Sequence, residues 1–269
     1  TVLPHDVDEF VASDVGADTA GVFRLFLDGS DVGLSTSGEK LDGIALDKDG
    51  ELLLSTVGNG NVLGLGAFAD EDVIRLDAGS YGAATTGTWS MFFDGSDVGW
   101  TKGIGDFEML PDGSLLLTTN TRFAVGVGAA RFTLEVQDIA RFVPTNLGPT
   151  SAGSFALYFD GSDVLLATTA ERIDALARKP DGTLLISTFG NASVKNGTVT
   201  VSAVDEDLLA FQPTSLGSTT AGTWSLSNGF VGSLLTGMAA ENVNGAWFDG
   251  ATGDLYLTLS SAFNVGGVA

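Results

Sequence analysis

The sequence predicts an all-β fold, a four-bladed β-propeller made of four repeats of about 66 residues within a single domain, 1–269. Three observations support this prediction: a motif that recurs at a fixed interval, a hairpin signal in every repeat, and a match between the two ends of the chain. Together they account for nearly the whole sequence, so we expect no linker and no second domain.

The recurring motif sets the period of the repeat. Its copies read FLDGSDVGL (26–34), FFDGSDVGW (92–100) and YFDGSDVLL (158–166), with a degenerate fourth copy, SNGFVGSLL (227–235). An aromatic residue precedes each copy, at intervals of 66, 66 and 69 residues: Phe23, Trp89, Phe155 and Trp224. We expect these residues to lie on one strand of each blade, with Trp89 and Trp224 in the core.

Each motif is followed by a hairpin signal. The segments read LDGIALDKDGELLLST (41–56), GDFEMLPDGSLLLTT (105–119), IDALARKPDGTLLIST (173–188) and NGAWFDGATGDLYLTL (244–259). An Asp-Gly type of turn between two apolar runs is a strong hairpin signal. A third strand follows in DEDVIRL (70–76), VQDIARF (136–142) and DEDLLAF (205–211).

The third strand of the last repeat is found at the other end of the chain. Residues 5–23 align with residues 206–224 without a gap. We therefore expect the closing blade to combine residues 5–27 with residues 244–259. Closure of this kind removes exposed sheet edges, which would otherwise promote aggregation.

Composition limits the partners. Acidic residues outnumber basic ones 34 to 12, giving a net charge of −22, and there is no cysteine. Such a surface repels nucleic acid and anionic membranes and favours cations or basic partners. No apolar run approaches the roughly 20 residues of a membrane span, so we expect no membrane insertion. The absence of cysteine excludes disulfides and thiolate metal sites.

Two resemblances to known propellers and repeats extend these predictions. DGIALDKDGELLLST resembles the inner two strands of NHL and SMP-30/gluconolactonase-like propellers, and the FDGSDVGL unit is similar to a repeat of large bacterial surface proteins. The first implies that the hairpin strands are innermost and the aromatic strand outermost. It also implies that the site lies on the face shared by the connections that enter the first strand and leave the second. It does not imply lactonase activity, because those propellers have six blades and unequal Glu, Asn and Asp ligands around one metal.

A set of polar residues opens the innermost strand of each repeat: Asp42, Asp106, Asp174 and Asn244. Around a narrow channel these side chains would lie close together, and like charges at short range require a cation or raised pKa values. Ca²⁺ binds six to eight oxygen ligands, which such a ring could supply. The alternative is that each carboxylate caps its own turn.

Two further acidic sets favour structural roles. The first is present in all four copies: Asp6, Asp72, Asp138 and Asp207. Identity in every blade indicates a geometric requirement of the blade rather than one ligand site. The second forms the DGSD turns at Asp28–Asp31, Asp94–Asp97 and Asp160–Asp163, which resemble fragments of calcium loops without their full spacing. His5, the single histidine, is interpreted as a surface variant.

The repeat symmetry favours a secreted, non-catalytic binding or surface module, for adhesion or as a scaffold, that is stabilised by Ca²⁺. Catalysis needs unlike residues in unlike roles, so no catalytic residue is predicted. Two alternatives stay open: a metal-dependent hydrolase of the esterase or lactonase kind at the channel mouth, and a carbohydrate-binding propeller. We expect an unknown protein or glycan partner at a bacterial surface, with the chain either a monomeric domain or part of a larger protein.

Overall fold

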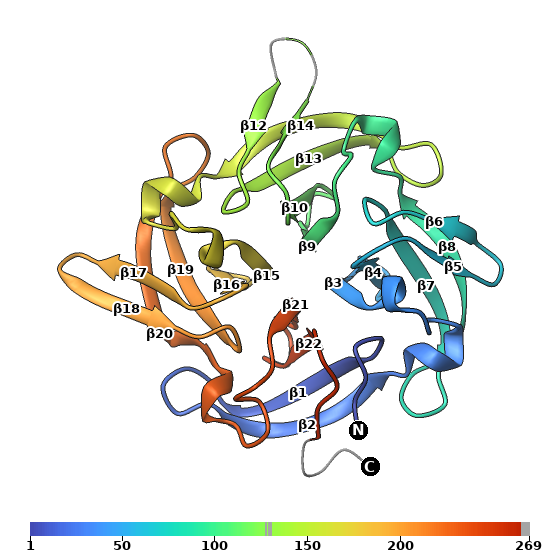
Figure 1. The fold of residues 1–269 in the computed structure, drawn as a ribbon, viewed down its shortest axis with the longest axis horizontal. Helices are drawn as coiled ribbons and strands as arrows, with labels where there is room; N and C mark the ends of the chain where they lie inside the picture. The colour runs from blue at the N-terminus through green and yellow to red at the C-terminus, as the bar shows by residue number, and fades with distance from the viewer. Residues whose placement is uncertain (127, 129–130, 265–269) are drawn as a thin grey trace.

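The computed structural model describes residues 1–126, 128 and 131–264, so residues 265–269 of the expected domain lie outside the described residues. In the described residues, four four-stranded antiparallel sheets surround a central axis as the blades of a β-propeller (Figure 1). Blade I contains β3 (Leu41–Leu46), β4 (Leu52–Thr56), β7 (Val73–Ser80) and β8 (Thr86–Phe93). Blade II contains β9 (Ile104–Met109), β10 (Leu115–Thr119), β13 (Ile139–Asn146) and β14 (Ala152–Phe159). Blade III contains β15 (Ile173–Arg178), β16 (Leu184–Thr188), β19 (Asp207–Ser215) and β20 (Ala221–Val231). The predicted fold class is confirmed.

Blade IV is shared by the two ends of the chain, as the gap-free match predicts. It contains β21 (Val243–Phe248), β22 (Leu255–Leu259), β1 (Val7–Asp14) and β2 (Ala20–Leu27). The N-terminal β1 pairs with the C-terminal β22, with Asp8 opposite Leu257 and Phe10 opposite Leu255. Backbone bonds between Val2 and Phe263 add a further link. The sheet hydrogen bonds of this blade therefore close the ring.

Two-stranded hairpins extend the connection between the second and third strands of blades I to III, a feature not predicted from the sequence. They are β5 (Gly60–Val62) with β6 (Gly66–Phe68), β11 (Phe123–Val125) with β12 (Phe132–Leu134), and β17 (Ala192–Asn196) with β18 (Val199–Ala203). They project from the periphery of the ring (Figure 1).

The apolar core lies between neighbouring blades, because both faces of each sheet are covered. The aromatic residue before each motif is buried, as predicted: Phe23, Trp89, Phe155 and Trp224. These rings contact aromatic residues on the adjacent strand, for example Phe142 and Phe155 with centroids 4.8 Å apart. Trp100 is also fully buried. No helix among the described residues has the length and apolar character needed to cross a bilayer.

The FDGSDV motif joins each blade to the next. Asp31 Oδ2 accepts a hydrogen bond from the Thr85 N–H at 3.0 Å, and the Trp89 indole N–H donates to the Val32 carbonyl at 2.9 Å. The same links recur at the next two junctions: Asp97 with Ser151, Asp163 with Thr220, and Trp224 with Val164. The DGSD turns therefore connect the outer edges of the blades.

The fourth copy of the motif lies three residues later than the sequence alignment placed it. Gly232 occupies the place of Gly29, since a Cβ on either would lie about 2 Å from the carbonyl oxygen that precedes the recurring Asp of the third strand. The shift comes from a bulge in β20, where Ser225 pairs with Ala210 but Phe230 pairs with Leu208. The intervening residues account for the longer final interval of the repeat.

Candidate functional site

The pairing of the inner hairpins fixes which residues occupy equivalent positions around the channel. Each inner strand starts with a residue paired to the end of the second strand: Leu41 with Thr56, Ile104 with Thr119, Ile173 with Thr188 and Val243 with Leu259. The next residues along the chain are Asp42, Gly105, Asp174 and Asn244. Asp106 therefore lies one residue beyond the predicted ring, and side chains of consecutive strand residues point in opposite directions.

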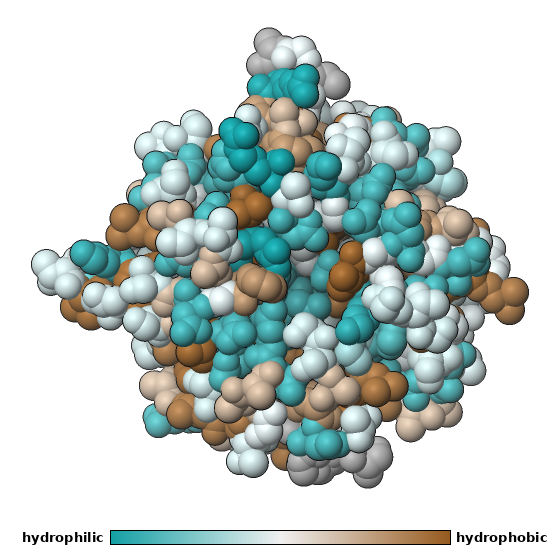
Figure 2. Space-filling view, viewed as in Figure 1, coloured by the Kyte–Doolittle hydropathy of each residue, from teal (hydrophilic) through white to brown (hydrophobic). Residues whose placement is uncertain are grey.

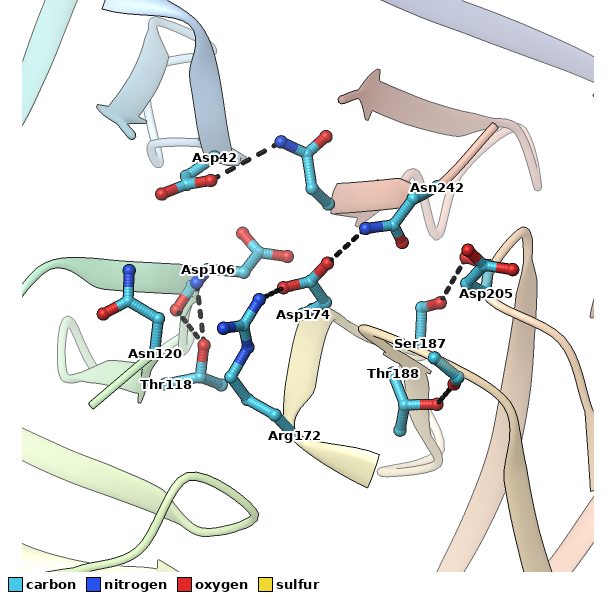
Figure 3. A network of polar contacts seen from close by, with 12 residues as sticks. Asp42, Asp106, Thr118, Asn120, Arg172, Asp174, Ser187, Thr188, Asp205 and Asn242 are labelled. Carbon is cyan, nitrogen blue, oxygen red and sulfur yellow. Dashed lines mark hydrogen bonds and ion pairs between the residues drawn. The ribbon is translucent and has the colours of Figure 1, made fainter. Parts of the chain in front are cut away.

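Asp106 binds all four inner strands at once. Its Oδ1 accepts from the backbone N–H groups of Ile44 at 3.1 Å and Phe107 at 2.7 Å. Its Oδ2 accepts from those of Leu176 at 2.6 Å and Ala246 at 3.0 Å. The side chain is fully buried at the centre of the propeller (Figure 3). One carboxylate thus ties β3, β9, β15 and β21 together.

Small residues on the other three strands make room for this carboxylate. The positions equivalent to Asp106 are Gly43, Ala175 and Gly245. A Cβ on Gly43 would lie 2.8 Å from Asp106 Oδ1, and one on Gly245 would lie 2.2 Å from the Asp42 carbonyl oxygen. Four carboxylates at this level could not fit, so the fourfold symmetry has to be broken here.

The contacts of Asp106 fit an ionised carboxylate. Burial raises the pKa of Asp106, and the backbone N–H groups that it accepts from lower it. Both oxygens receive two N–H donors each, so a proton on either oxygen would point at another donor. Because the donors are fixed by four strands, the negative charge is held by backbone dipoles in place of water.

A polar network lies at the channel mouth next to this carboxylate (Figure 3). Asp174 Oδ1 pairs with Arg172 Nη2 at 3.0 Å, and its Oδ2 accepts from the Asn242 amide at 2.7 Å. Asn244 donates to the Leu41 carbonyl at 2.6 Å and makes a long 3.5 Å contact with Asp42 Oδ1. The structure therefore brings three of the four predicted ring residues to the mouth, in unequal surroundings.

The two mouth carboxylates differ in their partners. Burial and the nearby charge of Asp174 raise the pKa of Asp42 well above its usual range. Burial also raises the pKa of Asp174, while the Arg172 guanidinium and the Asn242 amide lower it. Asp42 is thus the carboxylate of this network with the weaker compensation, and a cation would stabilise its charged form.

The donor set suits a metal ion only in part. Among the described residues, no three His, Cys, Asp or Glu side chains converge on a point that could hold a metal. Asp106 is occupied by backbone donors, which leaves Asp42 and Asp174 as the carboxylates of the mouth. The buried Asn242 Oδ1 has no hydrogen-bond partner, as expected of an oxygen that could face a cation. Most of the six to eight ligands of Ca²⁺ would have to be carbonyl or water oxygens.

The Asn residues near the ends of the second strands do not form one cluster with the mouth. Asn59 Oδ1 accepts from the Asp70 N–H at 3.2 Å, and Asn120 accepts from the Thr121 hydroxyl at 3.2 Å. Asn264 accepts from the Thr1 hydroxyl at 2.6 Å. Each is engaged by a local partner, and Asn191 makes no side-chain hydrogen bond with the described residues.

The invariant carboxylates of the third strand all make the same pair of bonds. One oxygen accepts from the N–H three residues earlier, and the other from an N–H in the turn after the outermost strand, as in Asp72 with Ala69 at 2.8 Å and Gly95 at 3.1 Å. The set is Asp6, Asp72, Asp138 and Asp207. These carboxylates fasten two turns of one blade together, which agrees with the predicted structural role.

Glu108, which is buried near the opposite mouth, was not predicted from the sequence. It shares its register position with Ala45, Ala177 and Trp247. Burial raises the pKa of Glu108 to about 8, against the lowering effects of the Arg178 N–H bond and charge. The signal was present in the sequence as a position where four aligned repeats carry three different residue types.

Comparisons with known proteins extend only to the fold. No protein-family model and no curated protein matches the sequence. The chain is similar to a streptogramin B lyase, at 13% identity over 91% of this chain and 70% of that one, with a TM-score of 0.35. It is also similar to a gluconolactonase from Xanthomonas campestris, at 13% identity over 88% and 75% of the two chains, with a TM-score of 0.32. A third is PorZ, a surface component of the type-IX secretion system of Porphyromonas gingivalis, at 13% identity over 93% and 37%, with a TM-score of 0.31. The chain is thus a four-bladed β-propeller with gluconolactonase-like structural neighbours.

Proposed function

We propose that this propeller is a non-catalytic binding module of a bacterial surface, stabilised by Ca²⁺ at the channel mouth. The observation that supports the proposal is the position of Asp106. The central carboxylate is held by four backbone N–H groups, so it acts as a structural strut that keeps the four inner strands together. A general acid or base instead needs a free oxygen near the reacting group.

The ligand surface in this proposal is the mouth formed by Asp42, Arg172, Asp174, Asn242 and Asn244. Hydrophilic residues gather over the inner strands in the face viewed in Figure 2. The unequal charges of this network suit a polar protein or glycan partner better than an apolar one. Ca²⁺ would neutralise Asp42, whose pKa is raised by burial and by Asp174.

A thermal melt in EDTA and in millimolar calcium tests the calcium part of the proposal. A ligand at a hundredfold excess over its Kd stabilises the native state by about 2.7 kcal/mol. For a domain of this size the Tm would rise by about 5–10 °C. We expect Asp42→Asn with Asp174→Asn to abolish the shift. The matched control, Asp49→Asn with Asp112→Asn in turns at the far ends of the inner strands, should retain it.

An unchanged Tm of the unmodified protein would refute calcium stabilisation, and a shift that survives in the Asp42 and Asp174 double variant would refute the site. The binding role is tested separately, by immobilising the protein and probing it with an array of bacterial glycans. Binding that the mouth variant loses and the control keeps would support the proposal, whereas equal binding by both would contradict it.

A hydrolase is the second candidate, favoured by the unlike groups Arg172, Asp174 and Asn242 at the mouth. A metal there would polarise an ester or lactone carbonyl. Turnover of p-nitrophenyl acetate or a γ-lactone that requires calcium and disappears in Asp174→Asn would favour the hydrolase over the binding module. Activity that is the same in the variant would arise elsewhere.

A further inference from the structure

A cavity of about 480 Å³ opens at the mouth opposite Asp42, where the inner strands end in their hairpin turns. Its apolar wall includes Leu46, Met109, Trp247 and Phe248, from the ends of β3, β9 and β21. Ligand pockets are typically of 300–1,000 Å³ with apolar walls and a few converging polar groups. This cavity therefore has the size and lining of a small-molecule site.

Glu108 lines the cavity and is 5% exposed. Its Oε2 accepts from the Arg178 backbone N–H at 3.2 Å, whereas its Oε1 makes no hydrogen bond with the described residues. A buried polar atom without a partner is costly, so native structures usually supply one. A ligand in the cavity is one way to provide that partner.

Arg178 is the second free group of the cavity. Its guanidinium makes no hydrogen bond or ion pair with any described residue, and its Nε is buried without a partner. It does not form an ion pair with the Glu108 carboxyl, which it contacts through its backbone N–H. A half-buried guanidinium in this state is available for an anion.

The other charged residues of the cavity are already paired. Asp47 contacts Arg75 at 3.9 Å, and Asp112 and Lys48 form ion pairs with Arg141 and Asp49 respectively. The local charge that remains is the positive charge of Arg178, because burial raises the pKa of Glu108 to about 8 and keeps its proton at neutral pH. Two hydrogen-bond donors, the guanidinium and the protonated carboxyl, therefore face a cavity with apolar walls.

We propose that this cavity binds a small organic carboxylate with an apolar or aromatic body. The ligand carboxylate pairs with Arg178 and accepts a hydrogen bond from Glu108. The body of the ligand packs against Trp247 and Phe248. The site is separate from the polar mouth at Asp42, so this inference does not depend on the proposed function.

Calorimetric titration with phenylacetate tests the inference, with benzyl alcohol and phenethylammonium as neutral and cationic probes of the same body. We expect phenylacetate to bind best. Its affinity should fall at least tenfold between pH 6 and pH 9, because ionised Glu108 would repel it. The other charged groups that line the cavity are Asp47 and Lys48 in the β3–β4 turn, Asp112 in the β9–β10 turn, and Arg178 on β15; β21 contributes only Trp247 and Phe248.

Three variants make the test specific. Arg178→Met should weaken phenylacetate at least tenfold, whereas Arg122→Met, which breaks an ion pair on an outer hairpin, should not. Glu108→Gln keeps a donor without titrating, so it should bind phenylacetate with little dependence on pH. Stronger binding of phenethylammonium, wild-type affinity in Arg178→Met, or no binding of phenylacetate to the unmodified protein would each overturn the inference.

Discussion

Replacing Asp106 by alanine should remove a large part of the stability of the propeller. The substitution leaves four buried N–H groups, on four strands, without an acceptor. An unsatisfied buried group costs about 1–3 kcal/mol, so the sum is roughly 4–12 kcal/mol. Water entering the space and the relief of burying a charge reduce this loss, and we expect about 4 kcal/mol. That is a large share of the roughly 5–15 kcal/mol typical of a domain.

Urea unfolding followed by tryptophan fluorescence measures the loss, and a graded series of variants tests its cause. Asp106→Asn keeps one acceptor oxygen and should lose less than Asp106→Ala. Asp72→Ala removes an acceptor from two N–H groups, and Asp49→Ala from none. We expect the loss of unfolding free energy to follow the number of stranded donors. A loss below about 1 kcal/mol in Asp106→Ala, or a different order in the series, would refute the reasoning.

Repeated and buried groups supply three further predictions. Alanine at each invariant third-strand carboxylate should cost a similar 1–3 kcal/mol in urea unfolding, because each strands two N–H groups; one variant with full stability but no ligand binding would contradict this for its blade: Asp6, Asp72, Asp138 or Asp207. Thr220→Val should lose about 1 kcal/mol, since its hydroxyl accepts from the Asp160 N–H at 2.9 Å across a blade junction, and an unchanged melt would exclude that link. The Tm should be highest near pH 5 and fall toward pH 8. Burial raises the pKa of Asp8 and Glu108 to about 8, so the native state holds protons that the unfolded chain has lost, and stability decreases as pH rises through this window. Below about pH 4 it should decrease again, because burial alone would raise the pKa of Glu39 but backbone donors from Asn61, Ser35 and Thr36 lower it to about 2. A Tm that rises steadily from pH 5 to pH 8 in thermal melts would contradict the buried acids.

The fold could be predicted because the repeat carries redundant information. Four aromatic residues and three Asp-Gly turns at a constant period specify the blade, and the match of residues 5–23 with residues 206–224 specifies the closure. Both closing strands from the N-terminus are found where the match places them. The hairpins between the second and third strands were missed because their segments differ in length and sequence among blades.

The candidate ring could be predicted only in part, because similarity of letters was preferred to counting from the turn. Aligning Asp106 with Asp42 matches the letters, but counting back from the Asp-Gly turn aligns Asp106 with Gly43. A shift of one residue in a strand exchanges the two faces. The hairpin turn fixes the register, so counting from it would have placed Asp106 at the centre and Asp42 at the mouth.

The fourth motif was misplaced for a different physical reason. A bulge adds residues to one strand without changing its partner, so the period of the sequence no longer measures the period of the structure. The final interval of 69 residues, against 66 elsewhere, carried this information. Gly229 lies in the bulge, where a Cβ would be 1.9 Å from the Leu208 carbonyl oxygen.

The comparison of equivalent positions separates architecture from function in this propeller. Where all four blades carry the same residue, as at Asp72, the side chain makes the same backbone bonds in every blade, and a ligand role would need four equal sites. Where the register position is the same but the residues differ, the blade does not dictate the choice. Ala45, Glu108, Ala177 and Trp247 form one such level of the channel, and Asp42, Gly105, Asp174 and Asn244 form another. Because the fold alone does not require these residues, variants at the two levels should change ligand binding more than stability.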